Sequence, residues 1–120
     1  MQFFIAAVST FTVTASYGAT LNEGFEASTA NGSYYTTATT VTGDACKWSL
    51  LESGVFSNEA RTGTKSVRLS KQATSSLTMT SNKSGGAGTV SFYGRKWSST
   101  EANAVIEVQY STNSGSTWTT

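Results

Sequence analysis

Histidine and proline are absent from this chain of 120 residues, and cysteine occurs once, as Cys46. Without histidine, the chain has no Ser-His-Asp or Cys-His catalytic site and no zinc site with histidine ligands. A single cysteine forms no internal disulfide and belongs to no thiolate cluster. Although Lys47 follows it, we expect Cys46 to be an inert, half-buried residue.

Charged side chains are scarce as well, at 12% of the residues, and the formal net charge is +1. Phosphate binding requires clustered lysine and arginine, whereas Arg95 and Lys96 form a pair rather than a patch. The charge therefore gives no case for nucleic-acid binding, nor for attachment to a membrane surface through a polybasic segment.

Apolar stripes with helical spacing are missing, and the chain is instead rich in threonine, serine and glycine. Short runs in which apolar and polar residues alternate recur between Gly, Asn and Ser turns, which predicts an all-β domain. Roughly seven to nine such strands favour an antiparallel β-sandwich of jelly-roll type. We expect strands within residues 21–26, 34–41, 47–52, 55–58, 66–70, 77–80, 89–97 and 104–110, with residues 81–88 as a hairpin connection. Trp48 shares a strand face with Leu50, so we expect it in the core.

Residues 3–15 are apolar enough for the core of a signal peptide, but too short and too rich in threonine for a membrane span. Small residues, where a signal peptidase would cut, follow: Ala15, Ser16, Gly18 and Ala19. The usual basic opening is missing, which suggests that the reading frame is clipped at its start. We expect residues 1–19 to be an export signal and residues 20–120 to be the secreted module. The alternative is a first β-strand, because Phe11 and Val13 alternate with threonine.

The most informative stretch is the run of residues 89–97. Val90 and Phe92 fall on one face of the predicted strand, and the opposite face carries Tyr93, Arg95 and Trp97. An outer face usually carries small polar residues, whereas aromatic and guanidinium groups suit the binding of a flat ligand.

Residues 104–110 alternate in the same way, with Glu107 and Gln109 on the face opposite Ile106 and Val108. If this strand pairs with the preceding one, its two polar side chains join the first three. The sequence thus predicts one ligand-binding face from Tyr93, Arg95, Trp97, Glu107 and Gln109. Asn113-Ser-Gly115 then marks a turn, after which the strand pattern resumes at Trp118.

Four motifs occur in a fixed order along residues 20–120. They are Phe25-Glu26, Gly63-x-x-Ser66-Val-x-Leu69, Gly88-x-Val-Ser-Phe92 and Ser111-x-x-x-Gly115-x-Thr-Trp118. This layout resembles the jelly-roll accessory modules of secreted Bacteroidetes-type proteins, which are related in layout to MAM, cleaved-adhesin and carbohydrate-binding modules. Such modules sit beside an enzyme, an adhesin repeat or a nuclease domain. The closing strands of that family are missing here, so the resemblance implies a module that is incomplete at its C-terminal end.

The resemblance also implies a structural calcium ion. In such families a carboxylate of the Phe-Glu opening helps to hold a cation, and Glu26 matches that position. Asp44 lies in a turn that could close on it, and calcium takes oxygen ligands of this kind. The alternative is that Glu23 and Glu26 are solvated acids at a strand edge.

Catalysis within these residues is not expected. Glu107 is the best candidate for a glycosidase carboxylate, but nothing near it would raise its pKa, so a solvated or sugar-binding role is favoured. The glycine-rich residues 84–88 lack the Lys-Ser/Thr and the helix of a phosphate-binding loop. We therefore expect a secreted, non-catalytic module that binds glycan or a surface polymer. The alternatives are an adhesive module that contacts protein, and the N-terminal accessory part of a larger secreted hydrolase or nuclease.

Overall fold

The computed structural model describes residues 7–14, 20–86, 88–96 and 105–120. Within them the chain forms eight β-strands and no helix. The strands are β1 (Ala7–Thr14), β2 (Leu21–Glu23), β3 (Thr39–Thr42), β4 (Lys47–Leu51), β5 (Ser53–Ser57), β6 (Lys65–Leu69), β7 (Ser76–Met79) and β8 (Thr89–Arg95). They build one five-stranded and one three-stranded sheet, and every strand pair is antiparallel. The all-β, antiparallel prediction is therefore confirmed.

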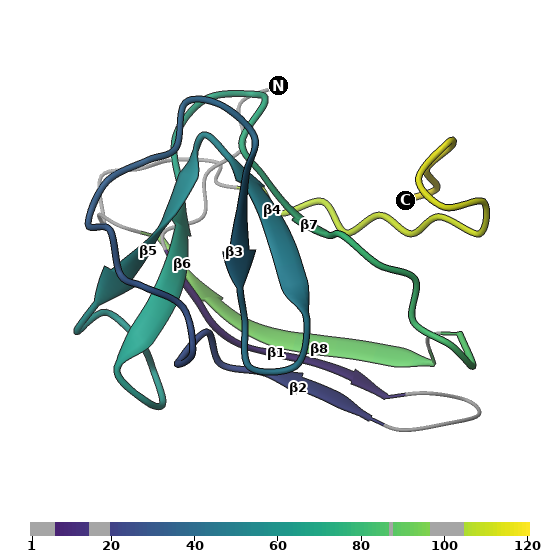
Figure 1. Cartoon of the computed structure of the whole chain (residues 1–120), viewed down its shortest axis with the longest axis horizontal. Coiled ribbons are helices and arrows are strands. Elements are labelled where there is room, and N and C mark those ends of the chain that lie inside the picture. Colours follow the sequence, from purple (N-terminus) through teal and green to yellow (C-terminus); the bar gives the residue numbers. More distant parts are fainter. Residues whose placement is uncertain (1–6, 15–19, 87, 97–104) are drawn as a thin grey trace.

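Strand β1 is the centre of the five-stranded sheet (Figure 1). It pairs with β8 along its whole length, from Ala7 opposite Arg95 to Thr14 opposite Thr89, with an irregularity after Val8. It also pairs with β2 and, at Val8, with β6, which continues the sheet to β5. Residues 7–14 thus form the strand that was the alternative to an export signal. Removal of residues 1–19 stays a prediction.

The three-stranded sheet has the order β3-β4-β7. Trp48 and Leu50 of β4 lie opposite Val41 and Thr39 of β3 on one side and opposite Met79 and Leu77 of β7 on the other. The alternation of apolar residues in β4 therefore places one apolar face across all three strands, as strand periodicity requires.

The core joins the two sheets. Among the side chains that the structure describes, the buried apolar ones are Phe25, Trp48, Leu50, Val55 and Val67. Trp48 and Leu50 come from the three-stranded sheet, whereas Val55 and Val67 come from the five-stranded sheet. The ring of Trp48 packs against that of Phe25 at 5.7 Å between centroids. The prediction that Trp48 is a core residue is confirmed.

Three connections differ from the expected ones. The opening strand ends at Glu23 rather than near residue 26, because Phe25 adopts a left-handed φ of 62° that no strand accommodates. Strand β5 already begins at Ser53, where a turn was expected, and the reversal occurs at Glu52, with φ of 48°. Residues 81–88 are not a hairpin connection, since β7 pairs with β4 and β8 pairs with β1 in the other sheet.

The last described segment, residues 105–120, lies outside both sheets (yellow in Figure 1). The strand expected at residues 104–110 is not formed, and only Tyr110 makes a bridge, to Thr119. The turn predicted at residues 113–115 is confirmed. Ser114 and Gly115 have φ of 57° and 84°, and the N–H of Ser116 donates to the carbonyl of Asn113 at 3.3 Å. Two successive positive φ angles are typical of tight hairpin turns.

Candidate functional site

The candidate ligand-binding face lies on β8. Val90 and Phe92 are half-buried, whereas Ser91, Tyr93 and Arg95 are exposed, so the predicted alternation of faces is confirmed. Tyr93 keeps 49% of its surface accessible, which is unusual for a large aromatic residue in a strand. Tyr93 and Arg95 lie two residues apart and therefore share this outer face.

Arg61 joins them from the loop between β5 and β6. Its guanidinium carbon lies 4.1 Å from the centre of the Tyr93 ring, a cation–π contact. The sequence gave no signal for this contact, because 31 positions separate the two residues and only the pairing of β1 with β8 brings them together. Arg61 is the binding-face residue that sequence reasoning missed.

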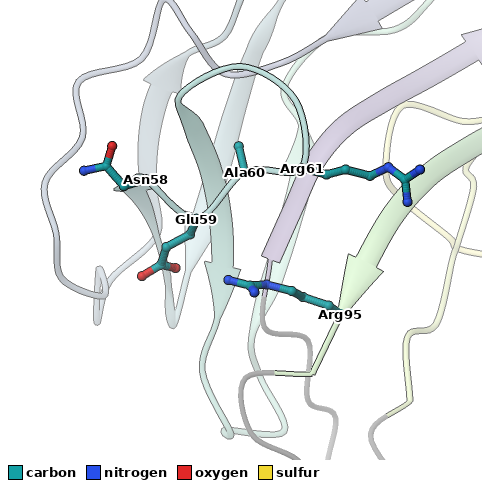
Figure 2. Close-up of a pocket in the computed structure, with 5 residues that line it drawn as sticks. All are labelled: Asn58, Glu59, Ala60, Arg61 and Arg95. Carbon is teal, nitrogen blue, oxygen red and sulfur yellow. The ribbon is translucent and has the colours of Figure 1, made fainter.

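A small hollow of about 170 Å³ adjoins this face (Figure 2). It is lined by Asn58, Glu59, Ala60, Arg61 and Arg95. Figure 2 shows Arg95 reaching from the end of β8 toward Glu59, while Arg61 extends the other way, toward β8. The carboxylate of Glu59 is already held by Arg68, whose Nε donates to Oε2 at 3.1 Å and whose second nitrogen forms an ion pair with Oε1.

Arg61 and Arg95 have a different electrostatic situation. Neither guanidinium makes an ion pair or a hydrogen bond with a carboxylate in the described part of the chain. With Glu59 neutralised by Arg68, two positive charges on and beside the face of β8 have no counter-charge. The face can therefore stack on a planar or apolar ligand surface through Tyr93 and also attract an anionic group.

The other predicted binding residues are not brought to this face. Glu107 and Gln109 lie in the segment outside the sheets and are hydrogen-bonded to each other, and Glu107 also accepts from Thr120 Oγ1 at 3.1 Å. In the described residues, no hydrogen bond or ion pair links this pair to Tyr93 or Arg95. Trp97 lies outside the described residues.

A second constellation surrounds Glu23, which is completely buried. Its Oε1 accepts from the N–H of Phe25 at 2.8 Å and of Asp44 at 2.7 Å. Its Oε2 accepts from the N–H of Ala45 at 3.2 Å and from Nε1 of Trp48 at 2.8 Å. Four donors thus offset the cost of removing this carboxylate from water. A Cβ at Gly43 would lie 2.2 Å from Oε2, so glycine is required where the turn approaches the carboxylate.

The expectation that Glu23 is a solvated acid is therefore wrong. The strand period does carry a signal for its burial, because Glu23 lies two residues after Leu21 and so shares its inward face. What the sequence does not show is the set of donors, which comes from residues 44–48 on the neighbouring chain segment.

Asp44 and Glu26 are further clamps between loops. Asp44 accepts from the N–H groups of Gly24, Glu26 and Ala27 at 3.0, 3.2 and 2.6 Å. Glu26 accepts at Oε1 from the N–H groups of Thr64 and Lys65 at 2.7 and 2.9 Å, and at Oε2 from the hydroxyl of Thr64 at 2.6 Å. Together with Glu23 they tie residues 23–27 to the 43–45 turn and to the start of β6.

These hydrogen bonds give both predicted calcium ligands another role. The hydroxyl of Thr64, followed by the N–H of Lys65, lowers the pKa of Glu26 below its ordinary value of 4.5. Within the described residues, no three acidic or sulfur side chains gather closely enough to share a metal ion. Calcium binding by Glu26 and Asp44 stays a prediction, and a cation there would have to compete with N–H donors.

Cys46 lies half-buried beside the Glu23 constellation and packs against the core. Burial, followed by the charge of Glu23, raises the pKa of its thiol to about 11. The thiol is thus protonated at neutral pH, which agrees with the expectation of an inert residue.

Comparison with protein-family models, with curated proteins and with solved structures finds no match for this chain. The described residues also contain no helix with the length and apolar character that a bilayer crossing needs. The candidate site therefore has to be interpreted from its own geometry and charge.

Proposed function

We propose that this chain is a secreted, non-catalytic module of jelly-roll type, which binds carbohydrate or another surface polymer through the outer face of β8. The observation that carries the proposal is the exposed ring of Tyr93, flanked by two guanidinium groups without a carboxylate partner among the described residues. Aromatic rings stack on the C–H faces of sugars, and arginine donates to hydroxyl, carboxylate and sulfate oxygens.

The arrangement also favours one kind of polymer. Arg61 lies over the Tyr93 ring, so a ligand at this ring meets a cation at its edge. Arg95 places a second cation on the same strand face. A polysaccharide that carries carboxylate or sulfate groups would satisfy both, whereas a neutral one would use the ring and leave the charges to water.

Affinity electrophoresis of the full chain tests the proposal with three gels, containing a neutral, a uronic-acid and a sulfated polysaccharide. We expect the chain to be retarded, most strongly by an acidic polymer. Tyr93→Ala should weaken the retardation and cost only about 1 kcal/mol of stability, the size of an exposed cation–π contact. Tyr110→Ala is the matched control, since Tyr110 is 57% exposed but lies outside the sheets.

Trp97→Ala extends the same test. If Trp97 belongs to the binding face, the variant loses retardation at nearly unchanged stability, whereas a core tryptophan would cost about 3–5 kcal/mol. A wild-type chain that no polysaccharide retards, or equal effects of Tyr93→Ala and Tyr110→Ala, would overturn the proposal. The first of these outcomes would favour the alternative of a module that contacts protein.

Secretion has its own measurement. Sequencing the N-terminus of exported protein should find that it begins near Thr20. Exported protein that still starts at Met1 would contradict the export signal without touching the binding proposal.

A further inference from the structure

The place that β1 occupies is a slot for one strand. β8 pairs with β1 on one side, and no other strand of the described residues pairs with β8. On its other side, β1 pairs with β2 at residues 11–13 and with β6 at Val8. Without β1, three strands would expose unpaired backbone groups toward a gap one strand wide, which is strongly unfavourable.

A second segment has the properties of a strand but no sheet to join. In residues 105–110, Ile106, Val108 and Tyr110 alternate with Glu107 and Gln109. Val105, Val108 and Tyr110 nevertheless expose 40%, 43% and 57% of their surfaces. A strand pattern with exposed apolar side chains indicates a segment that gains stability by pairing.

The direction of this segment matches the slot. β1 runs antiparallel to β2, β6 and β8. A segment that follows β8 and pairs back along it in a hairpin also runs antiparallel to β8, and so in the direction of β1. Residues 96–104 separate Arg95 at the end of β8 from Val105, and Arg95 is the residue opposite the start of β1. A connection of nine residues is ample for such a return.

We propose that residues 105–110 take the place of β1 between β8 and the β2/β6 side when β1 leaves, so that the two segments compete for one slot. The proposal goes beyond ligand binding and accounts for a chain whose residues 7–14 serve both as an export signal and as a strand. Removal of residues 1–19 on export would be the event that empties the slot, but the competition itself can be tested without it.

The test measures amide hydrogen exchange in the full chain and in its Thr12→Pro variant. Thr12 lies opposite both Asn22 and Ser91, and proline removes a donor and disfavours a central strand. We expect residues 105–110 to exchange freely in the parent chain and at least about tenfold more slowly in the variant. Thr78→Pro, in β7 of the other sheet, is the matched control and should leave their exchange unchanged.

Thr12→Gly, which weakens β1 without removing its donor, should give a smaller protection of the same segment. Adding Val108→Asp to Thr12→Pro should abolish the protection, while Thr112→Asp at the nearby turn should not. Unprotected residues 105–110 in both Thr12 variants would overturn the proposal. Loss of protection throughout the Thr12→Pro chain would overturn it equally, because the segment would then be unable to replace β1.

Discussion

The two ends of this molecule hold their loops in different ways. Around Glu23, three carboxylates from residues 23–44 accept hydrogen bonds from segments up to 39 positions away. In residues 105–120, most side-chain hydrogen bonds join residues two to four positions apart, as between Ser111 and Asn113. The first region is tied by tertiary contacts, and the second is a self-contained turn.

The difference teaches what a buried acid contributes to a small β-domain. A turn such as residues 113–116 forms from its own residues but fixes nothing beyond them. A carboxylate with four donors fixes the relative position of β2, the 43–45 turn and β4, because leaving any donor unpaired in the interior is costly. Loops of similar composition thus differ in stability according to whether an acid from elsewhere reaches them.

The largest expected effect comes from Glu23→Gln. A glutamine keeps the shape but turns an NH₂ group toward N–H donors, so the variant should lose about 3 kcal/mol or more of unfolding free energy. Urea denaturation of both chains measures it. Glu107→Gln is the matched control on an exposed acid and should change stability by less than about 0.5 kcal/mol. Equal effects of the two substitutions would erase the distinction between the regions.

Glu26→Gln should have a smaller effect that depends on pH. Because the pKa of Glu26 is lowered in the folded chain, the charged form stabilises the fold above its ordinary pKa of 4.5. That contribution is lost as the pH falls through the lowered folded value. The stability difference between parent and variant should therefore be present at pH 7 and shrink in acid. A difference independent of pH would show that the charge is not involved.

Calcium distinguishes a clamp from a metal site in the same region. If Glu26 and Asp44 hold calcium, adding the ion should raise the melting temperature, a chelator should reverse the rise, and Glu26→Gln should abolish it. If the carboxylates act only on N–H groups, the melting temperature should not respond in either chain. The absence of any response in the parent chain would remove the calcium prediction.

The smallest effect on stability, though readily measured, concerns Cys46. With a thiol pKa of about 11 in the folded chain against 9.0 ordinarily, alkylation at pH 8 should be about a hundredfold slower than in the unfolded chain. Glu23→Gln should raise the rate in the folded state, since it removes the carboxylate that opposes thiolate formation. Rapid alkylation of the native parent chain would contradict the description of Cys46 as an inert, desolvated residue.

The sequence alone determined the fold class, the core position of Trp48, the turn at residues 113–115 and the two faces of β8. These follow from local periodicity and from residues with special φ angles, which each segment carries by itself. Only the tertiary structure decided that residues 7–14 fill the centre of a sheet, that Arg61 lies over Tyr93, and that Glu23 is buried among four donors. Each depends on pairing between segments far apart in the chain, and pairing is set by which edges and donors the whole fold leaves to be satisfied.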